Sequence, residues 1–325
     1  MIEKVQFESE GSCLMVQPKP VILVTGADGQ VGHALLKALD GLGTVVASTL
    51  AGEPLSSLVP VVKADLSREL DIVGLVREVN PTIIVNPAAH TAVDKAESEP
   101  TLAYAINELA PRILAREAKA RGIPLVHYST DYVFDGSGHL PRTEDAPTGP
   151  LSVYGASKLA GEKAIRESGA QGLIFRTSWV FGDHGNNFVK TMLKLGRDRE
   201  ELKIVADQIG APSQAAMLAR MTRRALDQGL AKGFGTLAGV YHLCNAGETS
   251  WYGFAEEIFA QARALGVDLK VQRVIPIPTA DYPTPARRPL NSRLDCSKFC
   301  RTFGLPSLPT WQEALRETLP LILRG

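Results

Sequence analysis

The feature that most constrains the fold is an alternation that begins at residue 21, where short runs of β-branched apolar residues are followed by amphipathic stretches. The runs VILVT, TVVAS, TIIVN and PLVHYS are mostly apolar, and stretches such as VGHALLKAL and LAYAINELAPRILAREAKARG lie between them. Strands that are apolar on both faces are typical of a parallel sheet covered by helices on each side. The pattern therefore predicts a doubly wound, Rossmann-type α/β fold.

The alternation loosens after about residue 180, where proline-bearing segments such as GAPSQ and VIPIPTADYPTPARRPL interrupt the helical stretches. We expect residues 21–180 to form mainly an NAD(P)-binding region and residues 181–325 mainly a smaller substrate-binding region, with one shared cleft. Residues 1–20 have no clear period and are predicted to be an N-terminal extension outside the fold, so that Met15 could be the true start.

Charge and cysteine content narrow the class of partner. Lys+Arg and Asp+Glu both total 35, so no global field favours nucleic acid or a membrane surface. No apolar run approaches the roughly 18 residues of a membrane span, and no export signal stands at the N-terminus. The four cysteines form no C-x-x-C pair and are assigned no metal site. We expect a cytoplasmic protein with a small-molecule partner.

A glycine-rich turn follows the first predicted strand. Gly26, Gly29 and Gly32 have the spacing G-x-x-G-x-x-G, between the run VILVT and a helix expected to begin near Val31. Glycines let a backbone approach a pyrophosphate, and the N-terminus of a helix adds free N–H groups with partial positive charge. The turn predicts a dinucleotide site, whereas a lone turn of this kind would equally fit a structural bend.

The end of the second strand bears on which dinucleotide binds. NAD enzymes usually place a carboxylate there for the ribose hydroxyls, but this chain has Ser48 and Thr49. The absence of a carboxylate favours NADPH, although no arginine stands nearby and the two residues also fit an ordinary strand-end turn. Asp65 is expected near the adenine. The sequence therefore leaves NADPH and NADH both open.

Tyr154 and Lys158 open a helical stretch at i, i+4 spacing, which places phenol and ammonium on one face. A nearby cation favours the phenolate, so we expect Lys158 to lower the pKa of Tyr154 from its usual value of about 10. Thr130 follows the strand PLVH, at an edge where ligands of parallel sheets collect. Together the three residues predict a ketone reductase with a tyrosine proton donor.

Other chemistries find no support in the sequence. There is no G-x-S-x-G elbow, no HExxH motif and no Walker A loop. The six histidines have no metal-ligand spacing and are each expected to be structural. His90 is the exception, because it follows the strand TIIVN beside the cofactor.

The segments TGADGQVG, NPAAHTAVDKAESEP, YSTDYVFDG, YGASKLAGEK, FRTSWVFG, NNFVKTML, DQIGAP and YPTPARRPLNSRL resemble the dTDP-4-dehydrorhamnose reductase family. They run in order over roughly residues 21 to 318. This family belongs to the extended short-chain dehydrogenase/reductases. The resemblance implies reduction of the 4-keto group of dTDP-4-dehydro-L-rhamnose by NADPH or NADH, giving dTDP-L-rhamnose for cell-surface polysaccharide.

The resemblance also implies roles for individual residues. Tyr154 would donate a proton to the alkoxide, Lys158 would hold the nicotinamide ribose, Thr130 would polarise the carbonyl and Asp131 would touch the sugar. The cofactor set comprises Gly26, Gly29, Gln30, Val31, Gly32, Ser48, Thr49, Asp65, Leu66, Ala89, His90, Thr91, Tyr154 and Lys158.

Three further residues are candidates for the sugar nucleotide. Trp179 resembles a wall that stacks on the sugar, and equally fits a core tryptophan beside Phe181. Arg287 and Arg288 follow a proline-rich loop, and a guanidinium fork suits a diphosphate, although a solvated basic pair is the alternative. The sequence does not say which of the two would bind.

The resemblance leaves some matters open. Some members bind Mg²⁺ for dimerisation, which allows a homodimer here, but no Mg²⁺ site can be placed. The family's usual Asn-Ala-Ala is Asn86-Pro87-Ala88 in this chain. The regulatory subunit of methionine adenosyltransferase resembles the same family without catalysis, and epimerases or dehydratases of the superfamily share the Tyr-Lys pair. These remain the competing functions.

Overall fold

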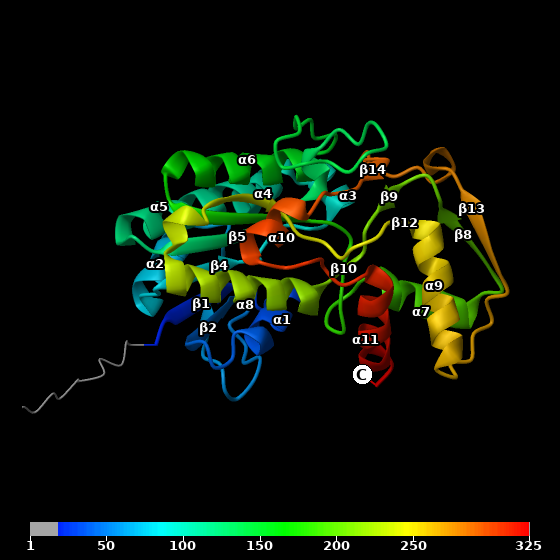
Figure 1. The fold of residues 1–325 in the computed structure, drawn as a ribbon, viewed down its shortest axis with the longest axis horizontal. Coiled ribbons are helices and arrows are strands. Elements are labelled where there is room, and N and C mark those ends of the chain that lie inside the picture. Colours follow the sequence, from blue (N-terminus) through cyan, green and yellow to red (C-terminus); the bar gives the residue numbers. More distant parts are fainter. Residues whose placement is uncertain (1–18, 325) are drawn as a thin grey trace, which may run out of the picture.

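The computed structural model describes residues 19–324 and has a parallel sheet at its centre, which confirms the predicted doubly wound α/β fold (Figure 1). The strand order is β11-β6-β5-β4-β1-β2-β3, and every neighbouring pair is parallel. The strands are β1 (Val21–Thr25), β2 (Thr44–Thr49), β3 (Val61–Lys63), β4 (Ile83–Asn86), β5 (Pro124–Thr130), β6 (Gln171–Thr177) and β11 (Gly239–His242). The predicted extension, except for residues 19 and 20, lies outside the described residues.

Helices cover both faces of the sheet because its strands are buried on both sides. One face packs against α1 (Gln30–Ala38), α8 (Ala215–Lys232) and α10 (Ser297–Phe303). The other packs against α2 (Glu69–Val79), α5 (Ala110–Arg121) and α6 (Val153–Ser168). The apolar side chains between helices and sheet form two separate cores, one on each face.

Short elements carry the chain past that carboxyl edge. After β4 come α3 (Val93–Ser98), α4 (Pro100–Tyr104) and the π-helical turn η1 (Ala105–Leu109), and after β5 comes the 3₁₀ turn η2 (Asp131–Val133). The strand order reverses between β1 and β4, so their loops diverge to opposite faces. Ligands of open α/β sheets bind at such a point.

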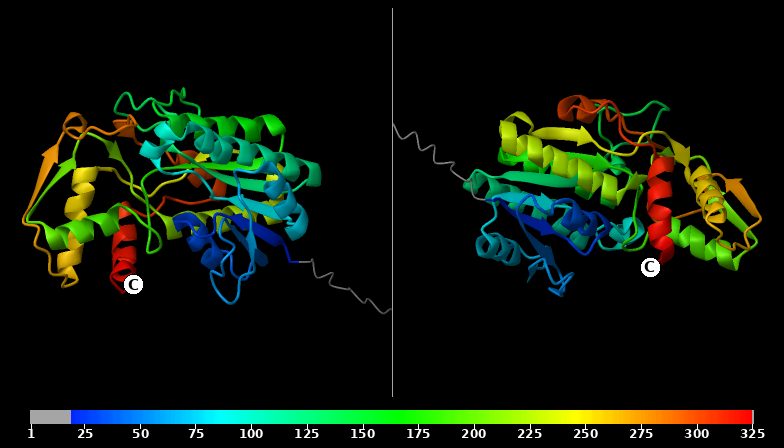
Figure 2. Two further views of the ribbon diagram at one scale, coloured as in Figure 1. Left: turned by 180° about the vertical axis from the view of Figure 1, so that it is seen from behind. Right: turned by 60° about the horizontal axis from the view of Figure 1, so that its bottom comes forward.

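The remaining helices form a smaller body at the carboxyl edge of the sheet (Figures 1 and 2). Its apolar core joins α7 (Phe188–Asp198), α9 (Trp251–Ala264) and α11 (Trp311–Arg324) with the parallel pair β8 (Glu201–Val205) and β13 (Arg273–Ile277). The short strands and turns are β7 (Val180–Phe181), β9 (Ile209–Gly210), β10 (Ser213–Gln214), β12 (Thr249–Ser250), β14 (Asn291–Ser292), η3 (Phe234–Thr236) and η4 (Thr279–Asp281).

The two parts are interwoven along the chain. After β7 and α7 have contributed to the smaller body, α8 returns to pack on α1, and β11 adds the outermost strand beside β6. The larger body is therefore built from residues on both sides of position 180. This crossing brings the connecting segments of both bodies to the same edge of the sheet.

Candidate active site

The glycine turn after β1 is held by close backbone packing. Gly26 has φ +54°, and the N–H of Gly29 donates to its carbonyl oxygen at 3.0 Å. A Cβ on Gly32 would lie 2.2 Å from that oxygen, and one on Gly26 would lie 2.8 Å from the Cα of Ala88. Gly29 caps α1 without a side-chain acceptor, so no side chain at the cap binds the first N–H groups of that helix. These N–H groups suit an anionic ligand.

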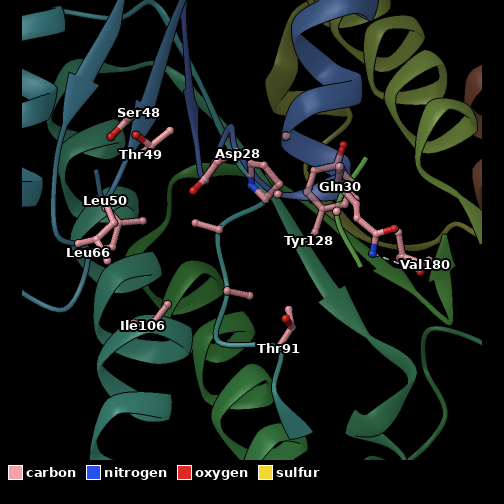
Figure 3. A pocket seen from close by; sticks show the side chains of 18 of the residues that line it. Asp28, Gln30, Ser48, Thr49, Leu50, Leu66, Thr91, Ile106, Tyr128 and Val180 are labelled. Atoms are coloured by element: carbon pink, nitrogen blue, oxygen red, sulfur yellow. Dashed lines mark hydrogen bonds between the residues drawn. The ribbon is translucent and has the colours of Figure 1, made fainter. Parts of the chain in front are cut away.

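A cavity of about 450 Å³ opens beside this turn (Figure 3). Ser48, Thr49 and Leu50 lie at one end of the view, and Gln30 and Val180 lie at the other. Its lining includes Gly26, Asp28, Gly29, Gln30, Val31, Gly32, Ser48, Thr49, Leu50, Ala64, Asp65, Leu66, Pro87, Ala88, Ala89, Thr91, Ile106, Tyr128, Ser129, Tyr154, Lys158, Thr177, Val180, Gly185 and Asn186. The structure thus brings every predicted cofactor residue except His90 to one cavity.

His90 lies just behind that wall. Its backbone N–H donates to Asn107 Oδ1 at 2.8 Å, and its carbonyl accepts from Asn107 Nδ2 at 3.1 Å. Its ring faces Glu99, with Nε2 3.8 Å from the carboxylate. The loop after β4 is therefore fixed by Asn107, which lies in η1, and the His90 side chain points to α3 and α4 rather than forming part of the cavity lining.

Residues after position 180 close over the glycine turn, an arrangement that the sequence did not reveal. Asn187 Nδ2 donates to Gln30 Oε1 at 3.1 Å, and His184 Nε2 lies 2.8 Å from the carbonyl oxygen of Asp28. His184 also stacks on His33, with ring centroids 4.2 Å apart. The segment between β7 and α7 therefore covers the turn, and Gly185 and Asn186 line the cavity for that reason.

Tyr154 and Lys158 lie on the first two turns of α6, whose N-terminus is capped by Ser152 accepting from the N–H of Gly155 at 3.2 Å. Burial raises the pKa of Tyr154 to about 12, and the nearby Thr130 hydroxyl opposes this rise. Burial lowers the pKa of Lys158 to about 8, opposed by Glu162. The pKa values of the two groups, nearly equal in the free side chains, are thus moved apart, with the lysine titrating well below the tyrosine.

The sequence predicted that Lys158 lowers the pKa of Tyr154, and the structure does not show this effect. Lys158 is not among the groups that shift the pKa of Tyr154. Its Nζ instead donates to the carbonyl oxygen of Tyr128 at 2.6 Å and lies 3.3 Å from His127 Nε2. Helical spacing puts both side chains on one face, but the long lysine side chain continues to β5, beyond the tyrosine ring. The prediction that Lys158 lowers the pKa of Tyr154 is therefore wrong for the protein alone.

Thr130 and Asp131 lie beside Tyr154 at the end of β5. The Thr130 hydroxyl donates to Asp131 Oδ1 at 3.0 Å, and Asp131 is almost fully buried. Burial raises the pKa of Asp131 to about 6. Its Oδ2 is buried and has no hydrogen-bond partner among the described residues. The site therefore contains a carboxyl group with an unused acceptor next to the tyrosine.

Trp179 has a different partner from the one that the sequence led us to expect. It has φ +48°, and its ring stacks on Trp251 with centroids 3.8 Å apart and an interplanar angle of 16°. Trp251 Nε1 donates to Gln208 Oε1 at 3.1 Å. Trp179 is half-buried, so one part of its surface stays exposed while its ring lies on a second indole.

The two arginines after the proline-rich loop are not equivalent. Arg288 Nη2 and Nη1 donate to Asp94 Oδ2 at 2.7 Å and Oδ1 at 3.1 Å, a bidentate pair that ties the loop to α3. Arg288 also lowers the pKa of Asp94. Arg287 is exposed and has no ion pair among residues 19–324. Of these two arginines, Arg287 is therefore the one whose guanidinium is not already bound to a carboxylate.

Sequence reasoning missed several residues of the site that lie around Lys158. His127 was expected to be structural, yet it contacts Lys158. The sequence signal was a histidine within an otherwise apolar strand, three residues before Thr130. Ser129 lines the cavity and donates to Glu162 Oε1, and Glu162 in turn pairs with Arg176 at 2.6 Å.

Comparison with known proteins places this geometry in a family. The profile described as RmlD substrate binding domain matches residues 20–323. The dTDP-4-dehydrorhamnose reductase of Escherichia coli (strain K12) is 47% identical, covering 92% of this chain and 96% of that protein. That of Burkholderia thailandensis is 48% identical, covering 90% and 96%. The chain belongs to the dTDP-4-dehydrorhamnose reductase family. The predicted family and enzyme class, a reductase, are confirmed.

A solved structure agrees with the sequence relatives. The dTDP-4-dehydrorhamnose reductase of Bacillus anthracis, in complex with NADP, superposes with a TM-score of 0.81 at 36% identity. The match covers 93% of this chain and 99% of that one. A member of this reductase family thus binds a nicotinamide dinucleotide on the same fold.

Two findings concern membranes and metals. Among residues 19–324, none of the helices combines the length and apolar content that a membrane crossing requires. The same stretch contains no group of three or more His, Cys, Asp or Glu side chains placed to hold a metal ion. The Mg²⁺ expected from the family resemblance therefore has no identifiable ligands in the described part of the chain.

Proposed function

We propose that this reductase converts the 4-keto group of dTDP-4-dehydro-L-rhamnose to the alcohol of dTDP-L-rhamnose, in the synthesis of rhamnose-containing cell-surface polysaccharide. One observation carries the proposal. The Thr130 hydroxyl lies close enough to the Tyr154 phenol to lower its pKa, and Tyr154 lines the glycine-turn cavity. A carbonyl oxygen placed between two such hydroxyls is polarised by one and protonated by the other.

The cavity fits a nicotinamide dinucleotide. The uncapped N-terminus of α1, with Gly29, Gln30 and Val31, would receive the pyrophosphate. Asp65 and Leu66 would flank the adenine, and Ala89 and Thr91 the nicotinamide side. Thr177 Oγ1 lines the same cavity, is buried and lacks a partner among the described residues, as expected of a ligand-binding hydroxyl. When bound, the cofactor supplies the hydride.

The chain's own side chains supply the proton. Tyr154 is protonated at neutral pH, because burial raises its pKa to about 12, so it is ready to donate. Lys158, buried one turn further, would hold the nicotinamide ribose and keep a positive charge near the phenolate that forms. Asp131 would accept from a sugar hydroxyl through its unpartnered Oδ2. Arg287 is the arginine we assign to the diphosphate, and Trp179 would form one wall of the sugar site.

NADPH is the cofactor we propose to be preferred. No carboxylate lies at the end of β2 to repel a 2′-phosphate, where Ser48 and Thr49 line the cavity. Thr49 Oγ1 accepts from the N–H of Gly52 at 2.9 Å, and Asp65 Oδ1 accepts from Ser67 at 2.9 Å. Titration of each reduced cofactor into the protein, followed by nicotinamide fluorescence, tests this proposal. Equal affinities or tighter binding of NADH would contradict it.

The decisive experiment is turnover. Incubation with dTDP-4-dehydro-L-rhamnose and NADPH should lower the absorbance of the reduced nicotinamide in proportion to dTDP-L-rhamnose formed. A non-catalytic regulatory subunit would bind cofactor without consuming it and would co-purify with a synthetase partner. An epimerase or dehydratase would return its cofactor unchanged. Binding without stoichiometric consumption would therefore reject the proposed reaction.

The remaining parts of the proposal concern organisation. Residues 21–180, completed by α8 and β11, would carry the cofactor, while the body around α7, α9 and α11 would carry the sugar nucleotide across a shared cleft. From the family resemblance we expect the protein to be cytoplasmic and to form a homodimer. Light scattering behind size exclusion, with and without Mg²⁺, measures the mass, and a monomer under both conditions would reject the dimer.

A further inference from the structure

A row of polar side chains crosses three strands behind Lys158. The Thr25 hydroxyl donates to Asn86 Oδ1 at 2.5 Å, and Asn86 Nδ2 lies 3.0 Å from His127 Nδ1. The other ring nitrogen of His127, Nε2, lies 3.3 Å from Lys158 Nζ. All four side chains are at most 2% exposed. The row thus links β1, β4 and β5 to the lysine through the buried interior of the sheet.

The donors and acceptors of this row limit its protonation. Burial and the charge of Lys158 hold the pKa of His127 well below its usual value, so its ring is neutral and carries one proton. With Asn86 Nδ2 donating to Nδ1, that proton is on Nε2, and Nε2–H faces Lys158. An ammonium has no lone pair to accept it. The arrangement is therefore complete only when Lys158 is a neutral amine.

A second complete arrangement follows from turning the Asn86 amide by 180°. Asn86 Nδ2 then donates to the Thr25 hydroxyl, and its Oδ1 accepts from Nδ1–H of His127. The freed lone pair of Nε2 accepts from the Lys158 ammonium. The two arrangements differ by one proton on Lys158 and by the tautomer of His127, while the ring stays neutral in both.

We propose that His127, supported by Asn86 and Thr25, is a positioning residue whose tautomer changes with the charge of Lys158 and stabilises its ammonium form. The proposal rests on the function assigned above to Lys158. The ammonium is the form that would stabilise the Tyr154 phenolate, so the row would keep Lys158 ready for catalysis after each proton transfer.

Other groups around Lys158 do not replace His127. On its own helix, Tyr154 lies one turn before it and Glu162 one turn after it. Glu162 raises the pKa of Lys158 but is itself bound by Arg176 of β6 and Ser129 of β5. The carbonyl oxygen of Tyr128 accepts from Nζ in either state. Of the two groups in hydrogen-bond contact with Lys158 Nζ, His127 Nε2 and the carbonyl oxygen of Tyr128, only His127 can change from acceptor to donor.

The charge of Lys158 sets which of the two arrangements dominates. Lys158 has a pKa of about 8, so the ammonium arrangement should dominate below that pH and the amine arrangement above it. A hydrogen bond to a charged donor is about twice as strong as one between neutral groups. Loss of His127 therefore weakens the ammonium more than the amine, and should lower the pKa of Lys158.

The first test reads the tautomer directly in the full-length protein without substrate. Nitrogen-15 NMR of histidine-labelled protein distinguishes Nδ1–H from Nε2–H, and the His127 signals are those lost in His127→Gln. We expect Nδ1–H at pH 6 and Nε2–H at pH 10, with a midpoint near pH 8. In Lys158→Met the switch should vanish. A His127 ring that keeps one tautomer in the wild type, or still switches in Lys158→Met, overturns the proposal.

The second test uses the alkaline limb of kcat/KM against pH. His127→Leu should move that limb down by about one pH unit, a tenfold change in the protonation equilibrium of Lys158. His127→Gln, whose amide oxygen can accept from the ammonium, should restore it towards the wild-type position. Asn86→Asp, which is nearly isosteric and fixes Nε2 as an acceptor, should move the limb upward. These opposite shifts are not expected of a residue that acts only in packing.

The matched control is His242, a histidine equally buried on β11, whose Nδ1 lies 2.9 Å from the carbonyl oxygen of Arg142. His242→Leu should lose stability as His127→Leu does, without moving the limb. If Asn86→Asp and His127→Leu both keep the wild-type limb, the inference fails while the reductase stands. If the wild type shows no turnover, the proposed function fails, and the tautomer measurement still decides the inference.

Discussion

The glycine-turn side and the sugar side of the site are built in different ways. On the glycine-turn side, residues that follow β1, β2 and β4 directly line the cavity, and the glycines of the turn permit close backbone packing. On the sugar side, the candidate groups are side chains such as Asp131, Trp179 and Arg287. Trp179 and the loop that carries Arg287 are held by partners far away in the sequence, Trp251 and Asp94. A site made by backbone follows from a local motif, whereas a site made by side chains depends on tertiary contacts.

The largest effect is expected at Tyr154, the residue that both sides of the site share. Tyr154→Phe removes the proton donor but keeps the ring, so kcat should fall by about 10³-fold while cofactor affinity changes little. Stopped-flow turnover and cofactor titration measure the two quantities. The control is Tyr252→Phe, a partly exposed tyrosine on α9 that should retain full activity. Loss of less than tenfold in Tyr154→Phe would place the proton donor elsewhere.

The second prediction tests the glycine-turn side. In Gly32→Ala the new Cβ would lie 2.2 Å from the carbonyl oxygen of Gly26, so the turn must open. We expect cofactor binding to weaken by about 100-fold, because the N–H groups of α1 lose their alignment. The control is Gly74→Ala on α2, where no atom outside the adjacent helix backbone and the neighbouring residues lies within 4 Å of the new Cβ. If Gly32→Ala binds cofactor normally by calorimetry, backbone packing does not make this site.

The extent of successful sequence prediction follows the same division. The strands β1, β2, β4 and β5 were predicted because they are apolar on both faces. The glycine turn was predicted because it follows the first strand directly, and most of the cofactor set came from the family resemblance. The π-helical turn η1 and the seventh strand, β11, were not predicted. Placing β11 beside β6 requires knowing that the chain returns to the sheet after the smaller body, and no local pattern encodes that return.

Within the site, the direction in which each side chain points was the main feature that the sequence could not predict. The i, i+4 spacing placed Tyr154 and Lys158 on one face, but the lysine was found to bind β5 instead of the phenol. Likewise, the stacking of Trp179 on Trp251 joins residues 72 positions apart, and the pairing of Arg288 with Asp94 joins residues 194 apart. Such partners compete for the same side chain, and spacing along the chain does not rank them.

The third prediction concerns Asp131 and the cost of keeping a carboxyl group buried. Its pKa in the folded protein is about 6, above the ordinary 3.8, so folding binds a proton and stability falls as pH rises between these values. Asp131→Asn removes the penalty and should gain about 1 kcal/mol more stability at pH 8 than at pH 5. Urea unfolding at both values measures this difference.

The matched control is Asp135→Asn, an exposed aspartate of the following loop whose pKa is lowered by hydrogen bonds from Ser137. Its variant should show no such gain at pH 8. The Asp131 variant should also bind the sugar nucleotide less tightly if Oδ2 accepts from the sugar. A stabilised Asp131→Asn with unchanged KM for the sugar nucleotide would show that the carboxyl group serves no function on the sugar side.

The smallest expected effect is at the ion pair that ties the proline-rich loop to α3. Asp94→Asn leaves Arg288 without its carboxylate, and because the pair is partly exposed, we expect a loss of stability of about 1 kcal/mol or less. The loop carrying Arg287 should loosen, so KM for the sugar nucleotide should rise about threefold at unchanged cofactor affinity. The control is Asp227→Asn, which breaks the Arg223 pair on α8. A change in cofactor affinity instead of KM would mean that the two sides of the site are coupled through α3, and that their construction is not as independent as the contacts imply.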